Sequence, residues 1–422
     1  MHFFRDYLKV FRSRNISVLL FLGFSSGLPL VLTSGTLQAW MTVDGVDLRA
    51  IGIFSLVGLP YTLKFLWSPI MDRFVPPLLG RRRGWIVLTQ IAIMLGIMAM
   101  SLNSPRNALW LMGVIALIIA FTSASQDIVA DAYRSDILRE QERGLGAAVF
   151  VTGYRIAMLV GGAVALILSD QIGWQRTYLL MAGLMTLGML AAFFGNEPQD
   201  DGTHPKTLQE AVWGPLHDFF SRPAAAIILL LIVLYKFCDA YAGTMTTPFL
   251  LRGVGFSATE VGTINKGLGL VSVIFGAMAG GTLMVRLGLF RSLMIFGILQ
   301  ALSNLSFILL AWIGKSYGML IFAVAFENLS SGMGTASFVS LLMALCNQRY
   351  SATQYALLSS LSALGRTFIA PTSGYVVESL GWALFFLITA LSAIPGLWLL
   401  WHYRSVITEL RHDTIEPAIS EK

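Results

Sequence analysis

Charged residues are scarce in this chain of 422 residues, and that scarcity is its first informative property. Asp, Glu, Lys and Arg together make up 12% of the sequence, whereas a soluble globular domain carries roughly 25%. Hydrophobic residues account for 56%. This composition argues against a soluble protein and indicates lipid as the solvent around most of the chain.

Cysteines, histidine clusters and phosphate-binding loops are also lacking. Cys238 and Cys346 are the two cysteines. Both lie in apolar segments, which favours small buried side chains over a disulfide framework or a metal site. The five histidines form no ligand cluster, and no glycine-rich Walker loop is present. We therefore expect no metal, no cofactor and no ATP hydrolysis, and we do not expect an enzyme.

Long stretches without a charge are what the sequence has instead. A membrane-spanning helix needs about 20 apolar residues, and stretches of that length without Asp, Glu, Lys or Arg recur from Arg14–Asp44 to Glu378–Arg404. The pattern predicts an all-α integral membrane protein with twelve transmembrane helices. The predicted spans are residues 16–41, 50–71, 84–103, 108–132, 146–169, 176–195, 224–250, 259–284, 291–313, 316–346, 353–378 and 382–403.

The distribution of Lys and Arg predicts the orientation. If the N-terminus is cytoplasmic, most of the 29 Lys and Arg residues fall in cytoplasmic loops or termini. Cytoplasmic loops are typically enriched in these residues, so both termini are expected in the cytoplasm. The net charge of +6 then reflects those loops and does not predict a nucleic-acid partner. The loops on the other side contain only Arg49, Arg106, Arg176, Arg252 and Lys315.

One long polar stretch, residues 196–223, divides the predicted helices six and six. It is expected to be a cytoplasmic linker between an N-terminal bundle, 1–195, and a C-terminal bundle, 224–403. Its end, around 208–220, is either an amphipathic surface helix or an ordinary connection. Residues 404–422 are expected to be a cytoplasmic tail. Two parallel six-helix repeats are the arrangement of major facilitator transporters.

The loop after the second span carries a short motif. Ser68 is followed by Asp72 and Arg73 and then by three arginines, and Gly281–Arg291 repeats part of this pattern in the second half. The first copy resembles the major facilitator loop motif, Gly-x-x-x-Asp-Arg/Lys-x-Gly-Arg-Arg, with Ser68 in place of the first glycine. We expect a gating role on the cytoplasmic side, with simple charge anchoring as the alternative. The candidate gating residues are Asp72, Arg73, Arg81, Arg82 and Arg83.

Longer stretches carry a more specific resemblance. They include LRAIGIFSLVGLPYTLKFLWSPIMDR at 48–73, SASQDIVADAYR at 123–134 and RGVGFSATEVGTINKGLGL at 252–270. These stretches resemble the AmpG family of muropeptide permeases. The resemblance implies import of N-acetylglucosaminyl-1,6-anhydro-N-acetylmuramyl peptides across a bacterial inner membrane, driven by the proton-motive force. The superfamily resemblance implies a monomer.

Ionisable residues inside predicted spans are costly in lipid and are therefore functional candidates. In the first half, Asp127 and Asp131 share a helix face. Two carboxylates that close together in a low dielectric resist simultaneous ionisation, so one can bind and release a proton. Asp127, Asp131, Asp239 and Glu327 are the candidates for proton coupling, with structural ion pairs as the alternative.

Cations and polar side chains at the same depth are candidates for binding an anionic substrate, because Lys and Arg hold carboxylates. Lys236 and Asp239 are three residues apart and can also pair within one helix. Trp40, Tyr61, Tyr154 and Tyr241 are weaker candidates for stacking on sugar rings. The proposed substrate-binding set is Tyr61, Lys64, Gln126, Tyr154, Arg155, Lys236, Lys266 and Arg366.

Three functional interpretations remain open from the sequence. The first is a proton symporter for muropeptides that works by alternating access of two halves. The second keeps the fold and changes the cargo to another anionic solute, such as an acyl-CoA, a peptide or a drug. The third is a membrane enzyme or sensor without transport, which the distribution of charges along the spans disfavours.

Overall fold

The computed structural model describes residues 14–68, 71, 75–76, 79–138, 143–197, 221, 225–345, 358–363 and 367–409. Within these ranges the chain forms helices joined by short turns, and no strand occurs in them. Each of the twelve predicted spans contains a described helix. The prediction of an all-α fold is therefore confirmed.

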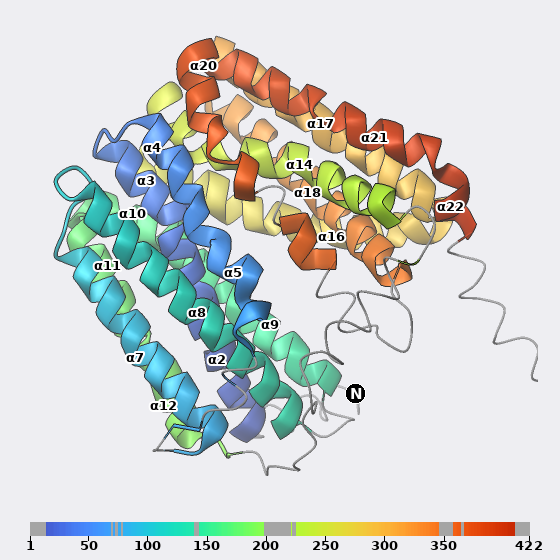
Figure 1. Ribbon diagram of the computed structural model, residues 1–422. Coiled ribbons are helices and arrows are strands. Elements are labelled where there is room, and N and C mark those ends of the chain that lie inside the picture. The colour runs from blue at the N-terminus through green and yellow to red at the C-terminus, as the bar shows by residue number, and fades with distance from the viewer. Residues whose placement is uncertain are drawn as a thin grey trace, which may run out of the picture. The chain divides into compact units, whose positions relative to one another are not determined.

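The helices of the first half follow the predicted spans closely (Figure 1). Their bounds are α2 Arg14–Thr33, α3 Gly35–Val43, α4 Leu48–Ile53, η1 Phe54–Gly58, α5 Leu59–Leu63, η2 Lys64–Leu66, α7 Arg81–Ser101, α8 Leu109–Ile137, α9 Arg143–Leu159, η4 Val160–Val164, α10 Ala165–Ile172, α11 Trp174–Leu184 and α12 Thr186–Phe194.

The second half begins after the predicted linker, most of which lies outside the described residues. Its helices are α14 Ala225–Pro248, η5 Phe249–Gly253, α15 Ala258–Glu260, η6 Val261–Leu268, α16 Gly269–Leu287, α17 Leu289–Ile313, α18 Tyr317–Ala344, α20 Thr372–Leu391, α21 Ala393–His402 and α22 Arg404–Glu409. At Gly381, φ is 79°, which breaks α20 at the expected boundary between the last two spans.

Nine helical stretches in the described part of the chain are long and apolar enough to cross a membrane. The predicted second span appears as a shorter apolar helix, Leu48–Leu63. α18 is long enough, at 28 residues, but Glu327 and its polar neighbours dilute its hydropathy. These polar interruptions fall where the sequence places candidate functional residues.

Two helices depart from α geometry next to an intramembrane lysine. The second span passes through 3₁₀ segments at η1 and η2, and Lys64 opens η2. Pro60 lies at the start of α5, and proline cannot continue the hydrogen-bond ladder of a helix. Lys266 lies in η6, a π-helical segment. Such departures are common at functional sites.

Contacts group the chain into two compact units. Unit 1 comprises Met1–Asp47, Val57–Thr203 and Ser257–Thr263, and unit 2 comprises Leu48–Leu56, His204–Phe256 and Ile264–Lys422. Segment 48–56 therefore belongs to unit 2, although the residues on both sides of it belong to unit 1. Segment 257–263 belongs to unit 1, although the residues on both sides of it belong to unit 2.

Segments 48–56 and 257–263 are each fixed by polar contacts inside the unit to which they belong. In unit 2, α4 packs on α20 (Figure 1), and Arg49 pairs with Glu378 at 2.5 Å. In unit 1, the Thr259 backbone N–H donates to Asp170 Oδ2 over 2.6 Å. Ser257 and Glu260 complete a capping box at the same helix start.

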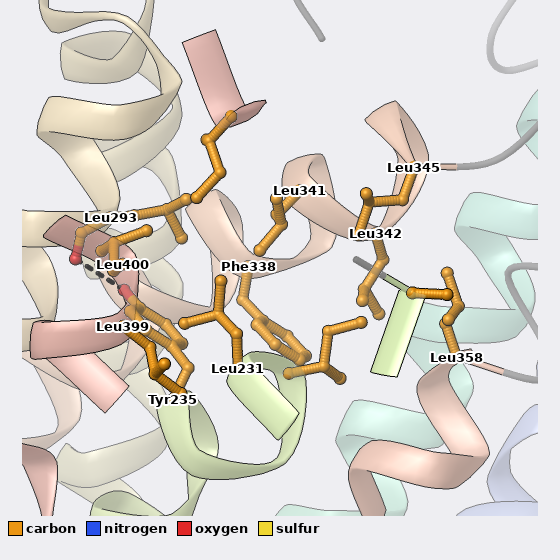
Figure 2. Packing of buried hydrophobic residues seen from close by; sticks show 13 residues of the cluster. Leu231, Tyr235, Leu293, Phe338, Leu341, Leu342, Leu345, Leu358, Leu399 and Leu400 are labelled. Atoms are coloured by element: carbon orange, nitrogen blue, oxygen red, sulfur yellow. Dashed lines mark hydrogen bonds between the residues drawn. The ribbon is translucent and has the colours of Figure 1, made fainter. Parts of the chain in front are cut away.

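The apolar core of unit 2 gathers leucines and two stacked aromatic rings (Figure 2). Tyr235 and Phe338 stack with ring centroids 5.7 Å apart. The Tyr235 hydroxyl donates to the Leu293 carbonyl over 2.9 Å, so this buried polar group is satisfied. Unit 1 has a comparable cluster, in which Tyr133 is fully buried. Both cores are built from buried helix faces.

Glycines allow two helix pairs to approach closely. In unit 1, a Cβ at Gly23 or Gly153 would collide with the backbone of the facing helix of the α2–α9 pair. In unit 2, the same holds for Gly276 and Gly332 between α16 and α18, which lie side by side (Figure 1). Small residues at such contacts are typical of membrane helices.

Replacing Gly276 with alanine is expected to destabilise the protein. The new methyl group would meet the Leu329 carbonyl, and overpacking of this kind costs about 1–3 kcal/mol. Gly281→Ala on the same helix is the matched control, because nothing lies within 4 Å of its added Cβ. Thermal unfolding in detergent should show a lower midpoint for Gly276→Ala alone. Equal midpoints for the two variants would contradict this packing.

Candidate functional site

In unit 1, the charged residues of the second and fourth spans form a connected group. The Lys64 ammonium lies 3.9 Å from Asp131 Oδ2. Arg134, one turn further along α8, lies 3.2 Å from Asp131 Oδ1. Arg134 is therefore a partner of Asp131 on the same helix. Lys64 is a second partner from another helix.

Asp127 differs from Asp131 in its surroundings. Its Oδ1 atom is buried and has no hydrogen-bond partner among the described residues. The charges that act on it are Lys64 and Asp131, and the Ser26 hydroxyl lies close by. A buried carboxylate oxygen without a donor is costly, so Asp127 Oδ1 has room for one further hydrogen-bond partner.

Hydroxyl groups surround this carboxylate. The Tyr61 hydroxyl is buried beside Ser123, Thr33 and Asp127, yet none of these lies in hydrogen-bonding geometry with it. The Ser123 hydroxyl is also buried and has no hydrogen-bond partner among the described residues. The second and fourth spans thus bring together buried polar groups of unit 1 that have no hydrogen-bond partner among the described residues.

The remaining substrate-binding candidates of unit 1 are divided between this interior and the surface. Gln126 is buried, and its Nε2 donates to Ser26 Oγ over 3.4 Å. Tyr154 lies within electrostatic reach of Asp127. Arg155 is exposed and contacts Met158 Sδ at 3.9 Å.

In unit 2, a charged pair links α14 to α18. The Lys236 ammonium lies 3.3 Å from Asp239 Oδ2, which confirms the pairing suggested by their spacing. The same ammonium donates to Thr335 Oγ1 over 2.9 Å. The Ser331 hydroxyl donates to Asp239 Oδ2 over 2.9 Å. Both charges of the pair therefore have a hydroxyl partner on α18.

Glu327 and Lys266 complete the charges of unit 2. Asn328 Nδ2 donates to Glu327 Oε2 over 2.5 Å, and Lys266 Nζ donates to Thr247 Oγ1 over 3.0 Å. Lys236, Lys266 and Asp239 all act electrostatically on Glu327. These four ionisable residues therefore form one network carried by α14, η6 and α18.

The loop arginines lie at one end of unit 1. Glu197 accepts hydrogen bonds from the backbone N–H groups of Arg82 and Arg83, over 2.8 and 3.1 Å, and so caps the start of α7. Arg82 pairs with Asp136 at 2.9 Å. Arg83 donates to the Ala192 carbonyl over 2.7 Å. Arg81 lies in the first turn of the same helix. All of these contacts tie helices together within unit 1.

Two of the aromatic candidates are buried inside the protein. Trp40 is 2% exposed and stacks on Trp174 at 5.9 Å, so its ring face is already occupied by protein. The Tyr241 hydroxyl hydrogen-bonds to Thr372 Oγ1 over 2.8 Å. Neither ring is available to a sugar in this arrangement.

Asp72, Arg73 and Arg366 lie outside the described residues. Residues that sequence reasoning missed include Ser331 and Thr335, which lie four and eight residues after Glu327 on the same helix face. The capping role of Glu197 was also missed, because it depends on a contact between residues far apart in the chain. Among the described residues, no three His, Cys, Asp or Glu side chains gather as metal ligands would.

Comparisons with known proteins agree with this geometry. The Major Facilitator Superfamily model matches residues 19–370. The anhydromuropeptide permease of Escherichia coli K12 is 55% identical over 94% of this chain and 81% of its own length. A putative transporter AmpG 4 of Rickettsia conorii is 34% identical over 94% of this chain and 99% of its own length.

Solved structures show the same fold at low sequence identity. A mutant of the peptide transporter POT superposes with a TM-score of 0.73 at 14% identity, over 94% of this chain and 95% of that one. A D-xylose–proton symporter gives a TM-score of 0.72 at 11% identity, over 92% and 97%. The chain is thus a multi-pass membrane protein of the major facilitator superfamily. Within that superfamily it belongs to the AmpG permease family.

The cap on α7 generates a stability prediction. Glu197→Ala removes the acceptor of two first-turn N–H groups and also a negative charge at a helix N-terminus, where it is favourable. We expect a loss of about 0.5–2 kcal/mol, the usual range for a lost N-cap. Glu197→Gln keeps one acceptor oxygen, so its stability should lie between that of the parent protein and that of Glu197→Ala. Denaturation of purified protein would measure the order, and an alanine variant as stable as the parent would refute the capping role.

Proposed function

We propose that the chain is a proton-driven permease that imports N-acetylglucosaminyl-1,6-anhydro-N-acetylmuramyl peptides across a bacterial inner membrane. The observation that carries the proposal is the 55% identity, over 94% of this chain, to an anhydromuropeptide permease. A cargo of this kind carries carboxylates and many hydroxyl groups, so its path needs cations and hydrogen-bonding side chains at membrane depth.

The arrangement inside each unit supports such a cargo and such an energy source. Lys64 in unit 1, and Lys236 and Lys266 in unit 2, supply positive charge where a carboxylate has to be held. Asp127 has a buried oxygen without a partner among the described residues, which suits a group that gains and loses a proton during a transport cycle. Ionisable side chains at this depth are otherwise too costly to keep.

The proposal includes an orientation and a working form. Both termini are cytoplasmic, the halves 1–195 and 224–403 alternate access around a central path, and the working unit is a monomer. The gate on the cytoplasmic side includes Asp72, Arg73 and the arginines at 81–83. The pairing of Arg82 with Asp136 supports a role for the loop in holding α7 and α8 together at that end.

The direct test is uptake of a labelled anhydro-muropeptide into proteoliposomes, with and without an inward proton gradient. Accumulation driven by the gradient is the expected result. Unlabelled acyl-CoA, peptide and drug competitors distinguish another cargo from this one. Binding without uptake, or competition by an unrelated anion alone, would overturn the assignment of the cargo.

Asp127→Asn is expected to abolish accumulation of cargo against the concentration gradient of the cargo. The same variant should still exchange cargo between two compartments that hold it at equal concentration. The physical reason is that an amide keeps the shape of the carboxyl group but cannot take up a proton. Asp44→Asn is the matched control, because Asp44 lies in a loop and accepts a hydrogen bond from Ser104 over 2.8 Å. Gradient-driven uptake by Asp127→Asn at the parental rate would remove Asp127 from the coupling mechanism.

A further inference from the structure

The lysine of the unit 2 charged pair has unused binding capacity. An ammonium group offers three N–H donors. Among the described residues, Lys236 Nζ has two acceptors, Asp239 Oδ2 at 3.3 Å and Thr335 Oγ1 at 2.9 Å. One donor therefore remains for a further acceptor.

The surroundings of the pair indicate that water or solute reaches it. The Lys236 and Asp239 side chains are 12% and 19% exposed, and Thr335 is exposed although it lies well inside α18. A charged pair facing hydrocarbon would be strongly unfavourable, so charged residues at this depth face an interior or a water-filled cavity. The remaining N–H donor of Lys236 is therefore expected to be accessible to water.

Three polar residues of α18 form a stripe that faces this network. Glu327, Ser331 and Thr335 are four residues apart, which places them on one helix face. Ser331 holds Asp239 and Thr335 holds Lys236. Asp239 Oδ2 accepts from both Ser331 and Lys236, so the two hydroxyls fix the two charged groups in one geometry.

We propose that Lys236 is the subsite for a carboxylate group of the cargo and that Ser331 and Thr335 are its positioning residues. The proposal rests on the proposed function and deepens it. Without cargo, Asp239 is the counter-ion of Lys236. An incoming carboxylate takes the remaining N–H and forms a charge-assisted hydrogen bond, which is stronger than a neutral one.

This arrangement selects for charge. A carboxylate gains the hydrogen bond and the attraction of the ammonium, whereas a primary amide at the same place gains neither in full. Thr335 matters because it holds the ammonium at a fixed position, since a flexible lysine chain loses more freedom on binding when nothing orients it. Discrimination between acid and amide is therefore the property that these residues control.

The experiment compares two cargoes, a labelled anhydro-muropeptide and the same molecule with its carboxylates converted to primary amides. We expect wild-type protein to prefer the acid by about tenfold or more in KM, the effect of one hydrogen bond to a charged group. Lys236→Gln should lose this preference, so that the acid binds as weakly as the amide. Its kcat should change less than its KM.

Positioning variants distinguish this role from a structural one. Thr335→Ala is expected to raise KM for the acid by about tenfold and to leave KM for the amide unchanged, and Thr335→Ser should restore the parental value. Ser331→Ala should act in the same direction. Ser340→Ala on α18 is the matched control, because its hydroxyl bonds its own helix at the Ala336 carbonyl.

Two results would overturn the subsite. One is wild-type protein that binds acid and amide equally, and the other is Lys236→Gln with the parental KM for the acid. A variant that misfolds is recognised by its thermal unfolding midpoint, and the conservative Thr335→Ser then decides. Failure of the proposed function is a separate result, because wild-type protein would then take up neither cargo.

Discussion

The cost of placing charge at membrane depth is the constraint on which the structure depends. Several of the described charges inside the spans are held by a nearby group of the same unit. Lys266 has Thr247, Glu327 has Asn328, and Lys236 has both Asp239 and Thr335. The hydroxyl and amide groups of the helices are therefore as necessary as the charges, because without them an ion pair rarely repays its desolvation.

The backbone meets the same constraint. Non-helical or irregular backbone at membrane depth is tolerated only where protein or water covers it. Lys64 opens a 3₁₀ segment, and Lys266 lies in a π-helical one. Neighbouring helices pack tightly elsewhere, with Gly276 and Gly332 letting α16 and α18 touch backbone to backbone. One side of α18 packs closely on α16. Its polar residues Ser331 and Thr335 contact the charged pair on α14.

Part of this site could be predicted from the spacing of residues within one helix. The rest depends on how the helices pack against one another. The Lys236–Asp239 and Asp131–Arg134 pairs follow from separations of three residues on a helix, and Pro60 marked the irregular second span. The partners Thr335, Ser331 and Thr247 could not be found in the same way, because they depend on how one helix is rotated against another. The cap of Glu197 on α7 joins residues more than a hundred positions apart. No local pattern encodes it.

The two units satisfy their carboxylates differently, and the difference agrees with the proposed roles. In unit 2, Asp239 and Glu327 each accept a hydrogen bond from α18, so their oxygens are engaged in holding a fixed array of charge. In unit 1, Asp127 Oδ1 and the hydroxyl groups of Tyr61 and Ser123 have no hydrogen-bond partner in the part of the chain that the structure describes. A site for exchanging a proton needs an oxygen that is not already committed, whereas a site that recognises an anion needs cations that do not move. The same fold can meet both demands because its halves repeat the helices but not the hydrogen bonds between them.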